Sequence, residues 1–438
     1  MHGILVRERK MQMRLIDRGM FSRRDLIKTM GVGGTAWMLA QTSFARGEVP
    51  EGPSAKGLEQ DDDSACPLIE LHKNSDDEKR EEGMALCVSG GGYRAMLFHL
   101  GTIWRLNMAG LLPQLKRISS VSGGSITAGV LGYAWQTLIF EGNVAQNFHE
   151  KVVLPIRKLA GETIDVGAVL KGIFLPGTIS DKVRNAYGDY LFGDATLQNL
   201  PDEPRFVINA TNVQSGALWR FSKPYMADYR VGQVLKPTTP LAVVVAASSA
   251  FPPVLSPLEL EIEPGQCVDM KGTDLHREPF TTNVILTDGG TYDNLGLEPV
   301  WKFSTVLVSD AGQKMKEEED PDINWAGHSL RVLGIIDNQV RSLRKRQLIA
   351  AFKKGDRKGA YWGIRTDILD YEIPNKFDCP LDRTLELASV PTRLKELEPL
   401  IQERLINWGF AVCDAALRAH VRQDLEKPDT LPYPGSPI

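Results

Sequence analysis

The chain has 438 residues, which is enough for one large domain or two ordinary ones. Hydrophobic residues make up 42% and charged residues 24%, so a largely disordered or fibrous chain is excluded. The net charge is −4, or −9 without the first 45 residues, where 43 basic and 52 acidic residues remain; this balance argues against nucleic acid as a partner.

The first 45 residues have the features of a signal peptide for export. Arg23 and Arg24 stand in a stretch that looks like the twin-arginine pattern, and an uncharged segment over 29–44 follows. Residues 43–45 (Ser-Phe-Ala) have the small-x-small form of a cleavage site. The uncharged segment is short and glycine-rich for a bilayer span, which favours export over a membrane anchor or a disordered basic arm. We therefore expect a periplasmic or extracellular protein, free or membrane-associated, with a polar linker over residues 46–82.

The five cysteines lack any C-x-x-C spacing, so neither a zinc site nor a redox motif is predicted. Cys87 lies in an apolar run, where we expect it to serve packing. One disulfide formed after export stays open as an alternative. The other four cysteines are Cys66, Cys267, Cys379 and Cys413.

Short apolar runs that predict buried strands alternate with helical stretches. The first strand is expected at 84–88, ahead of a glycine turn and a helix from about 93 to 109. A second strand at 118–121 precedes a helix that continues to about residue 140. This alternation predicts an α/β layered domain with a largely parallel, buried sheet. Further strands are expected at 205–213, 283–286, 305–308 and 330–336, and one or two long helices over 391–422.

Three consecutive glycines, Gly90, Gly91 and Gly92, connect the first predicted strand to its helix, which then continues with Tyr93 and Arg94. Several backbone N–H groups are unpaired at such a helix start, and the absence of Cβ atoms lets a ligand approach closely. The helix dipole adds positive potential. The turn therefore suits a phosphate or the oxyanion of a tetrahedral intermediate. Arg94 would add positive field or hold the loop through carbonyl groups.

The same residues fit the G-x-G-x-x-A form of a dinucleotide fingerprint. That fingerprint requires an acidic residue about 20 positions further on, to bind the ribose. No Asp or Glu occurs between Arg94 and Phe140. We therefore reject a dinucleotide site.

The second predicted strand runs into a bend with a serine, followed by a helix. Gly123, Gly124 and Ser125 form this bend, which suits a nucleophile exposed at a helix N-terminus. Gly123 supplies the small neighbour before the serine, while Thr127 stands where the G-x-S-x-G pattern has its second glycine. Ser125 is thus predicted as the nucleophile of a partly matched motif.

A nucleophilic serine requires a base. The only histidine near the bend in the sequence is His99, which we expect to be packed within its helix rather than catalytic. Asp288 follows an apolar strand and precedes Gly289 and Gly290, which places a carboxylate where α/β sheets bind ligands. Asp288 is therefore the predicted base, although an ordinary Asp-Gly turn fits the local sequence equally well.

Together, the glycine turn, the serine bend and the late Asp-Gly-Gly resemble the patatin-like phospholipase family in type, order and spacing. The stretches over 247–253 (ASSAFPP) and 209–212 (NATN) add to the resemblance, which covers roughly residues 84 to 300. Two positions depart from the family's glycine motif, because Ser89 and Ala95 stand where Asp and Gly are usual. Thr127 is a third departure, in the serine motif.

The resemblance implies a three-layer α/β/α fold with a mostly parallel central sheet. The catalytic domain would span residues 83–425, with a helical portion over about 391–422 and a tail over 426–438. It also implies a serine lipid acyl hydrolase that acts through a Ser125–Asp288 dyad and an acyl-enzyme, without histidine, metal or organic cofactor. The oxyanion would be held by N–H groups around Gly91 and Gly92, with Tyr93 or Ile126 as further donors.

The implied substrate is a lipid or a membrane surface. Residues 341–358 hold eight Lys/Arg and one acidic residue, which suits anionic headgroups, but the basic residues are scattered around the helix, so a solvated face is favoured. Two other functions stay open. One is an α/β-hydrolase with a Ser-His-Asp triad that uses His328 or His420, and the other is a catalytically silent lipid-binding or envelope protein.

Overall fold

The structure is a computed structural model that describes residues 80–164, 179–252 and 255–438. The predicted signal peptide and almost all of the predicted linker therefore lie outside the described residues. The strands are β1 (Glu81–Val88), β2 (Leu115–Val121), β3 (Phe140–Glu141), β4 (Val144–Ala145), β5 (Arg205–Asn212), β6 (Leu218–Phe221), β7 (Tyr225–Asp228), β8 (Gly232–Leu235), β9 (Leu258–Glu261), β10 (Cys267–Val268), β11 (Asn283–Asp288), β12 (Phe303–Asp310) and β13 (Lys358–Gly363). The helices are α4 (Gly92–Met108), α5 (Gly123–Ala134), α6 (Leu154–Ala160), α7 (Ile179–Tyr187), α8 (Leu241–Ser248), α9 (Gly290–Asp293), α10 (Trp325–Lys353), α11 (Leu381–Ala388) and α12 (Pro399–His420).

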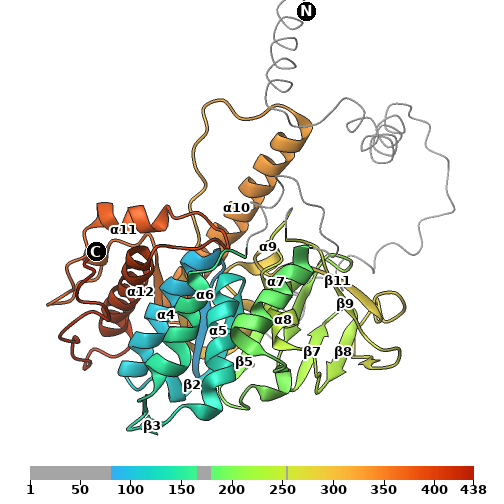
Figure 1. Ribbon diagram of the computed structural model, residues 1–438, viewed down its shortest axis with the longest axis horizontal. Coiled ribbons are helices and arrows are strands. Elements are labelled where there is room, and N and C mark those ends of the chain that lie inside the picture. The colour runs from blue at the N-terminus through green and yellow to red at the C-terminus, as the bar shows by residue number, and fades with distance from the viewer. Residues whose placement is uncertain (1–79, 165–178, 253–254) are drawn as a thin grey trace, which may run out of the picture. The chain divides into compact units, whose positions relative to one another are not determined.

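A mixed sheet forms the centre of the fold, and the strand order along it is β10-β8-β7-β6-β5-β2-β1-β12-β13. The strands β5, β2, β1, β12 and β13 are parallel to one another, as predicted. The remaining strands pair antiparallel, and β11 joins β5 to β9 from outside this path. The sheet thus has a parallel half that carries the first two turns and an antiparallel half that carries the third (Figure 1).

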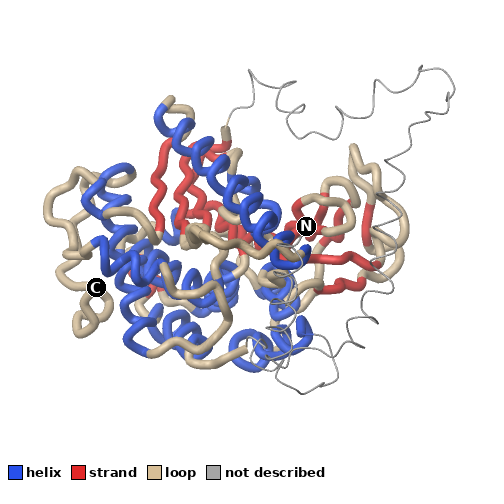
Figure 2. The backbone as a smooth tube through the Cα atoms, turned by 90° about the horizontal axis from the view of Figure 1, so that it is seen from above, coloured by secondary structure: helices blue, strands red, loops and turns tan. Residues whose placement is uncertain are grey.

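Alternate side chains of β1 pack into two different clusters, which gives the sheet a helix layer on each face. Leu86 and Val88 belong to the large core beneath α4, α5 and α12, whereas Ala85 and Cys87 pack with Leu348 of α10 on the other face. Figure 2 shows the strands as one layer, with most of the helices along one side of it. The three-layer α/β/α prediction is confirmed, as is the packing role of Cys87.

Helices α4 and α12 cross at very short range because each has a glycine at the crossing. A Cβ atom on Gly101 would lie 1.9 Å from the carbonyl oxygen of Ile406, and one on Gly409 would lie 1.9 Å from that of Phe98. A buried ion network joins the same helices, since Asp414 receives hydrogen bonds from Arg105 at 2.9 Å and from Arg418 at 3.0 Å. The C-terminal helix is therefore an integral part of the core that supports the site.

Two predicted elements differ in the structure. Residues 330–336 are expected to be a strand, but they lie within the N-terminal half of α10, where their apolar side chains are largely exposed. A short apolar run does not by itself distinguish a strand from a helix. The predicted helical stretch over 391–422 contains one helix, α12, after an irregular segment.

The described cysteines Cys87, Cys267, Cys379 and Cys413 are buried and free, and Cys66 lies outside the described residues. Within the ranges that the structure describes, no helix is long and apolar enough to cross a membrane.

Candidate active site

Ser122 occupies the sharp bend between β2 and α5. Its φ of 51° and ψ of −121° lie in a region that residues with a side chain rarely adopt, and only 7% of the residue is exposed. Strain of this kind is typical of a nucleophile held at a strand-to-helix turn. The Ser122 N–H donates a 3.0 Å hydrogen bond to the hydroxyl of Ser248, which helps to hold the bend. The residue at the elbow is therefore Ser122.

Ser125 lies one turn further into α5, and the structure does not bring it to Asp288. It is fully buried, and its hydroxyl contacts those of Ser120 at 3.0 Å and Ser248 at 2.8 Å. The placement of Ser125 at the elbow is thus wrong, because the helix has already begun at Gly123. Ser125 instead belongs to a group of hydroxyls beneath the elbow.

Asp288 ends β11 and faces the elbow. The register of the sheet brings it there, since Val121 pairs with Asn209 on β5, and Asp288 pairs with the next residue, Ala210. β11 runs antiparallel to β5. The Asp288 carboxylate therefore reaches the edge of the sheet where β2 ends, but it arrives from the direction opposite to that of a parallel strand. The two segments, some 160 residues apart in sequence, therefore meet in space.

Burial raises the pKa of Asp288 to about 7, and the charge of Asp337 also raises it, while hydrogen bonds from the Gly290 N–H and the Ser122 hydroxyl lower it. One carboxylate oxygen accepts the Gly290 N–H at 2.7 Å. The other is buried and has no hydrogen-bond partner among the described residues, although the Ser122 hydroxyl lies close enough to the carboxylate to affect its pKa. An ionised Asp288 would have an unsatisfied oxygen to accept a proton.

The glycine turn lies directly against the elbow. A Cβ atom on Gly90 would lie 3.1 Å from the Cβ of Ser122, and one on Gly123 would lie 2.1 Å from the carbonyl oxygen of Gly92. Within the described chain, the N–H groups of Gly91, Gly92 and Gly123 have no hydrogen-bond acceptor. These three amides are therefore available to an oxyanion beside Ser122.

The other candidate donors are already engaged. The Gly90 N–H donates to the carbonyl of Asn294, the Tyr93 N–H to that of Arg393, and the Ile126 N–H to that of Ser122. Of the donors that the sequence implies, only Gly91 and Gly92 therefore keep a free N–H in the described chain.

Arg94 fastens the glycine turn to segments that follow the sheet. Its buried guanidinium donates to the carbonyl groups of Ala311 and Val390 and, at 2.9 Å, to the hydroxyl of Thr392. Burial lowers its pKa to about 10. Of the two roles considered for Arg94, the structure shows the one in which it holds the loop.

The remaining small residues of the motifs allow close approach of backbones. A Cβ atom on Gly124 would lie 2.5 Å from the carbonyl oxygen of Val88, and one on Gly289 would lie 2.4 Å from that of Asn209. Thr127, the departure from the serine motif, donates to the carbonyl of Met96 at 2.8 Å and ties α5 to α4. Thr127 therefore has a structural role, which is to hold these two helices together.

Asn294 is a site residue that the sequence did not reveal. Its side-chain oxygen lies where Cβ atoms on Gly90 or Gly290 would be, at 2.4 and 2.7 Å respectively, so the side chain fills the space between the two glycine turns. Its only signal in the sequence is its position one helical turn after Gly290.

A sequence signal for Ser122 existed as well. Ser122 and Gly124 have the spacing of the last part of G-x-S-x-G, with Ser120 in place of the first glycine. Each serine thus misses one glycine of the motif, and only the point at which β2 ends distinguishes them.

None of the three histidines considered from the sequence contacts Ser122 or Asp288 in the described part of the chain. The ring of His99 is buried between the Ser309 hydroxyl and the Ser89 carbonyl, both at 2.9 Å, and burial lowers its pKa to about 4. His420 packs against the ring of Tyr371 at 5.8 Å, and His328 is exposed on α10. The prediction that His99 is packed within the fold is confirmed.

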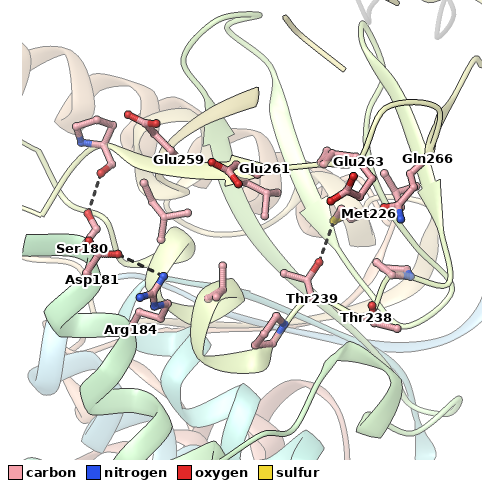
Figure 3. Close-up of a pocket in the computed structure, with 18 of the residues that line it drawn as sticks. Ser180, Asp181, Arg184, Met226, Thr238, Thr239, Glu259, Glu261, Glu263 and Gln266 are labelled. Carbon is pink, nitrogen blue, oxygen red and sulfur yellow. Dashed lines mark hydrogen bonds and ion pairs between the residues drawn. The ribbon is translucent and has the colours of Figure 1, made fainter. Parts of the chain in front are cut away.

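A separate cavity of about 910 Å³ lies between α7 and the strands β7, β8 and β9 (Figure 3). Its lining includes Arg184 on α7 and the acidic side chains of Glu259, Glu261 and Glu263. Neither Ser122 nor Asp288 lines it. This cavity is therefore separate from the site at Ser122 and Asp288.

Residues 86–301 match the patatin-like phospholipase family, so this part of the chain carries a domain of that family. A search of curated protein sequences gives no match.

Among solved structures, human GIVD cytosolic phospholipase A2 is similar at 14% identity over 53% of this chain and 46% of that chain, with a TM-score of 0.33. The same human protein in complex with methyl gamma-linolenyl fluorophosphonate is similar at 13% identity over 77% and 59%, with a TM-score of 0.44. VipD from Legionella pneumophila is similar at 15% identity over 78% and 67%, with a TM-score of 0.32. The chain thus spans about half of the human protein in the first comparison.

Proposed function

We propose that the protein hydrolyses carboxylic ester bonds of phospholipids or related lipids through a Ser122–Asp288 dyad. One observation carries this proposal: the hydroxyl of a strained, nearly buried serine approaches a buried carboxylate beside three free glycine amides. The family match supplies the lipid ester as substrate class.

In the first half of the reaction, Asp288 accepts the hydroxyl proton of Ser122 as the serine oxygen attacks the ester carbonyl. The developing oxyanion is held by the N–H groups of Gly91, Gly92 and Gly123. The intermediate collapses as Asp288 returns the proton to the departing alcohol, which leaves the acyl group on Ser122.

In the second half, a water molecule attacks the acyl-enzyme and gives its proton to Asp288. The fatty acid leaves, and the proton returns to Ser122. Burial serves this cycle, because a carboxyl with a pKa of about 7 is a stronger base than an exposed one and is still substantially ionised near neutral pH.

The test is labelling of the full chain with an alkyl fluorophosphonate, followed by fragmentation of the modified peptide. We expect the label on Ser122, no label on Ser122→Ala, and wild-type labelling of Ser125→Ala. A label on Ser125, or ester turnover in Ser122→Ala, contradicts the dyad. Labelling abolished by substitution of His328 or His420 would support the triad instead.

We further propose that the chain is exported through a twin-arginine signal at residues 1–45, which lie outside the described residues. The paired Arg23 and Arg24 and the uncharged segment after them support this. Replacement of both arginines by lysine should retain the protein in the cytoplasm, as cell fractionation would show. Unchanged export of that variant contradicts the proposal.

A further inference from the structure

A stripe of exposed apolar side chains runs along one side of α10. We define the α10 stripe as Trp325, Val332, Leu333, Ile336 and Leu343, of which Leu333 is 59% and Ile336 54% exposed. Spacings of three, four and seven residues place these side chains on one side of the helix, and the exposed Leu330 (51%) and Ile335 (46%) flank them. Contiguous apolar surface of this kind marks an interaction site in a soluble protein.

The C-terminal half of α10 is anchored beside the proposed active site. Arg344 forms an ion pair with Asp293 at 3.6 Å, and its guanidinium lies over the ring of Tyr292 at 5.5 Å. Both partners belong to α9, which follows Asp288 after a single glycine. Figure 1 shows α10 extending from α9 outward, away from the sheet.

The middle of the stripe lies near Asp288. Asp337 of α10 is close enough to Asp288 to raise the pKa of that carboxyl, and Leu333 precedes Asp337 by one helical turn. A second exposed apolar residue, Phe251, is 55% exposed and follows Ala250, whose carbonyl accepts the N–H of Asp288. Apolar surface therefore lies on two segments that border the base.

Charge distinguishes between kinds of lipid surface. Two basic residues of α10 contact the rest of the protein: Lys345 lies over the ring of Tyr361 at 4.3 Å, and Arg331 pairs with Glu318 at 3.4 Å. The exposed Arg346 and Lys353 lie further along the helix, beyond the apolar stripe. Over residues 312–343 the chain has four Lys/Arg and six Asp/Glu. An anionic surface would be repelled there, whereas an electrically neutral one would not.

We propose that the α10 stripe docks on the surface of a zwitterionic phospholipid bilayer and brings the dyad to its substrate. The inference rests on the proposed function, which requires access to esters held in a lipid phase. A convex helix with an apolar side and Trp325 near its free end suits insertion among lipid headgroups, which need no complementary groove. A folded protein partner would need such a groove for this helix.

The experiment compares the full chain with the double variant Leu333→Gln/Ile336→Gln, in which charge and helix propensity are preserved. A matched control, Ile139→Gln/Leu154→Gln, changes two side chains of similar exposure, 59% and 49%, on other elements. Binding is measured by co-sedimentation with phosphatidylcholine vesicles, and turnover with those vesicles and with a water-soluble short-chain ester.

We expect the stripe variant to bind vesicles about tenfold or more weakly, since two apolar side chains no longer leave water. Its hydrolysis of vesicle lipid should fall in parallel, while hydrolysis of the soluble ester stays at the wild-type rate. The control variant should match the wild type in all three measurements, and binding should not depend on salt.

The proposal is overturned if the wild-type protein does not bind phosphatidylcholine vesicles. It is also overturned if the stripe variant binds them as well as the wild type does. Binding that needs anionic lipid overturns it too, as does a stripe that mediates self-association in sedimentation velocity without affecting vesicle binding. If the wild type binds vesicles but hydrolyses neither substrate, the proposed function fails while the docking surface stands.

Discussion

The backbone N–H of Ser122 donates a 3.0 Å hydrogen bond to the hydroxyl of Ser248, a buried residue at the end of α8. The same hydroxyl donates to the carbonyl of Asn209 at 2.7 Å, which links the elbow to β5. Ser248 therefore holds the strained bend from beneath without being placed to touch the substrate.

Loss of this hydroxyl should slow the reaction. In Ser248→Ala the Ser122 N–H loses its partner in a buried site, so we expect kcat to fall by about tenfold or more. KM and the pH midpoint should stay unchanged, because neither the substrate surface nor Asp288 is altered. The neighbouring Ser249→Ala removes a hydroxyl that bonds Tyr187 and Val245 instead, and it serves as the matched control. Equal losses in both variants would mean that Ser248 acts only through stability.

The two serines of the bend should behave oppositely. Ser122→Ala should reduce ester hydrolysis by about 10⁴-fold or more, because the nucleophile is lost. Ser125→Ala should stay within about tenfold of the wild type, since its hydroxyl only contacts Ser120 and Ser248. Steady-state kinetics on a soluble ester decides between them. A larger loss of activity in Ser125→Ala than in Ser122→Ala would show that Ser125 is the nucleophile.

Activity should rise with pH through about 7. Asp288 must be ionised to accept the proton, and its pKa is raised to about 7, so kcat/KM should fall about tenfold per unit at lower pH. A pH profile on a soluble ester measures this midpoint. Removal of the nearby negative charge in Asp337→Asn should move the midpoint to lower pH. A midpoint near 4, the range of an ordinary carboxyl, would contradict the burial of the base.

Burial of the Asp288 carboxyl should also lower the stability of the folded protein at high pH. Because the pKa of Asp288 is higher in the folded chain than in the unfolded one, the folded state retains a proton between about pH 4 and 7. Stability therefore decreases as pH rises through this window, by up to about 4 kcal/mol for three pKa units. Asp288→Asn should remove this dependence and raise the melting temperature at pH 8 more than at pH 5. Parallel melting curves at both values would show that the carboxyl is not buried as described.

The ion network between α4 and α12 should matter to folding. Asp414 accepts from both Arg105 and Arg418 in a buried site, so Asp414→Asn removes the carboxylate that the two guanidinium groups share. We expect a loss of about 3–5 kcal/mol in the free energy of unfolding, measured by urea titration. Asp424→Asn, which breaks an exposed pair with Arg422, should have no measurable effect. A small loss in Asp414→Asn would show that the network is dispensable.

Much of the fold was accessible from local sequence. The runs that end at Val88 and Val121 are strands because apolar residues there are bounded by glycine turns. The first of the helices that follow begins close to the predicted position, whereas the second begins at Gly123, before the predicted start. Residues 330–336 were misassigned because their apolar side chains, exposed on a projecting helix, resemble those of a buried strand when only a short run is considered.

The sequence by itself determined which chemical groups are present: a glycine turn with free amides, a bend with two serines, and Asp288 before two glycines. Only the tertiary structure decided which serine faces the carboxylate, since that depends on where β2 ends and on the register that sets Asp288 beside Ala210. Backbone dihedral angles and strand register come from contacts between distant segments. Local residue preferences leave Ser122 and Ser125 equivalent, and the sheet separates them.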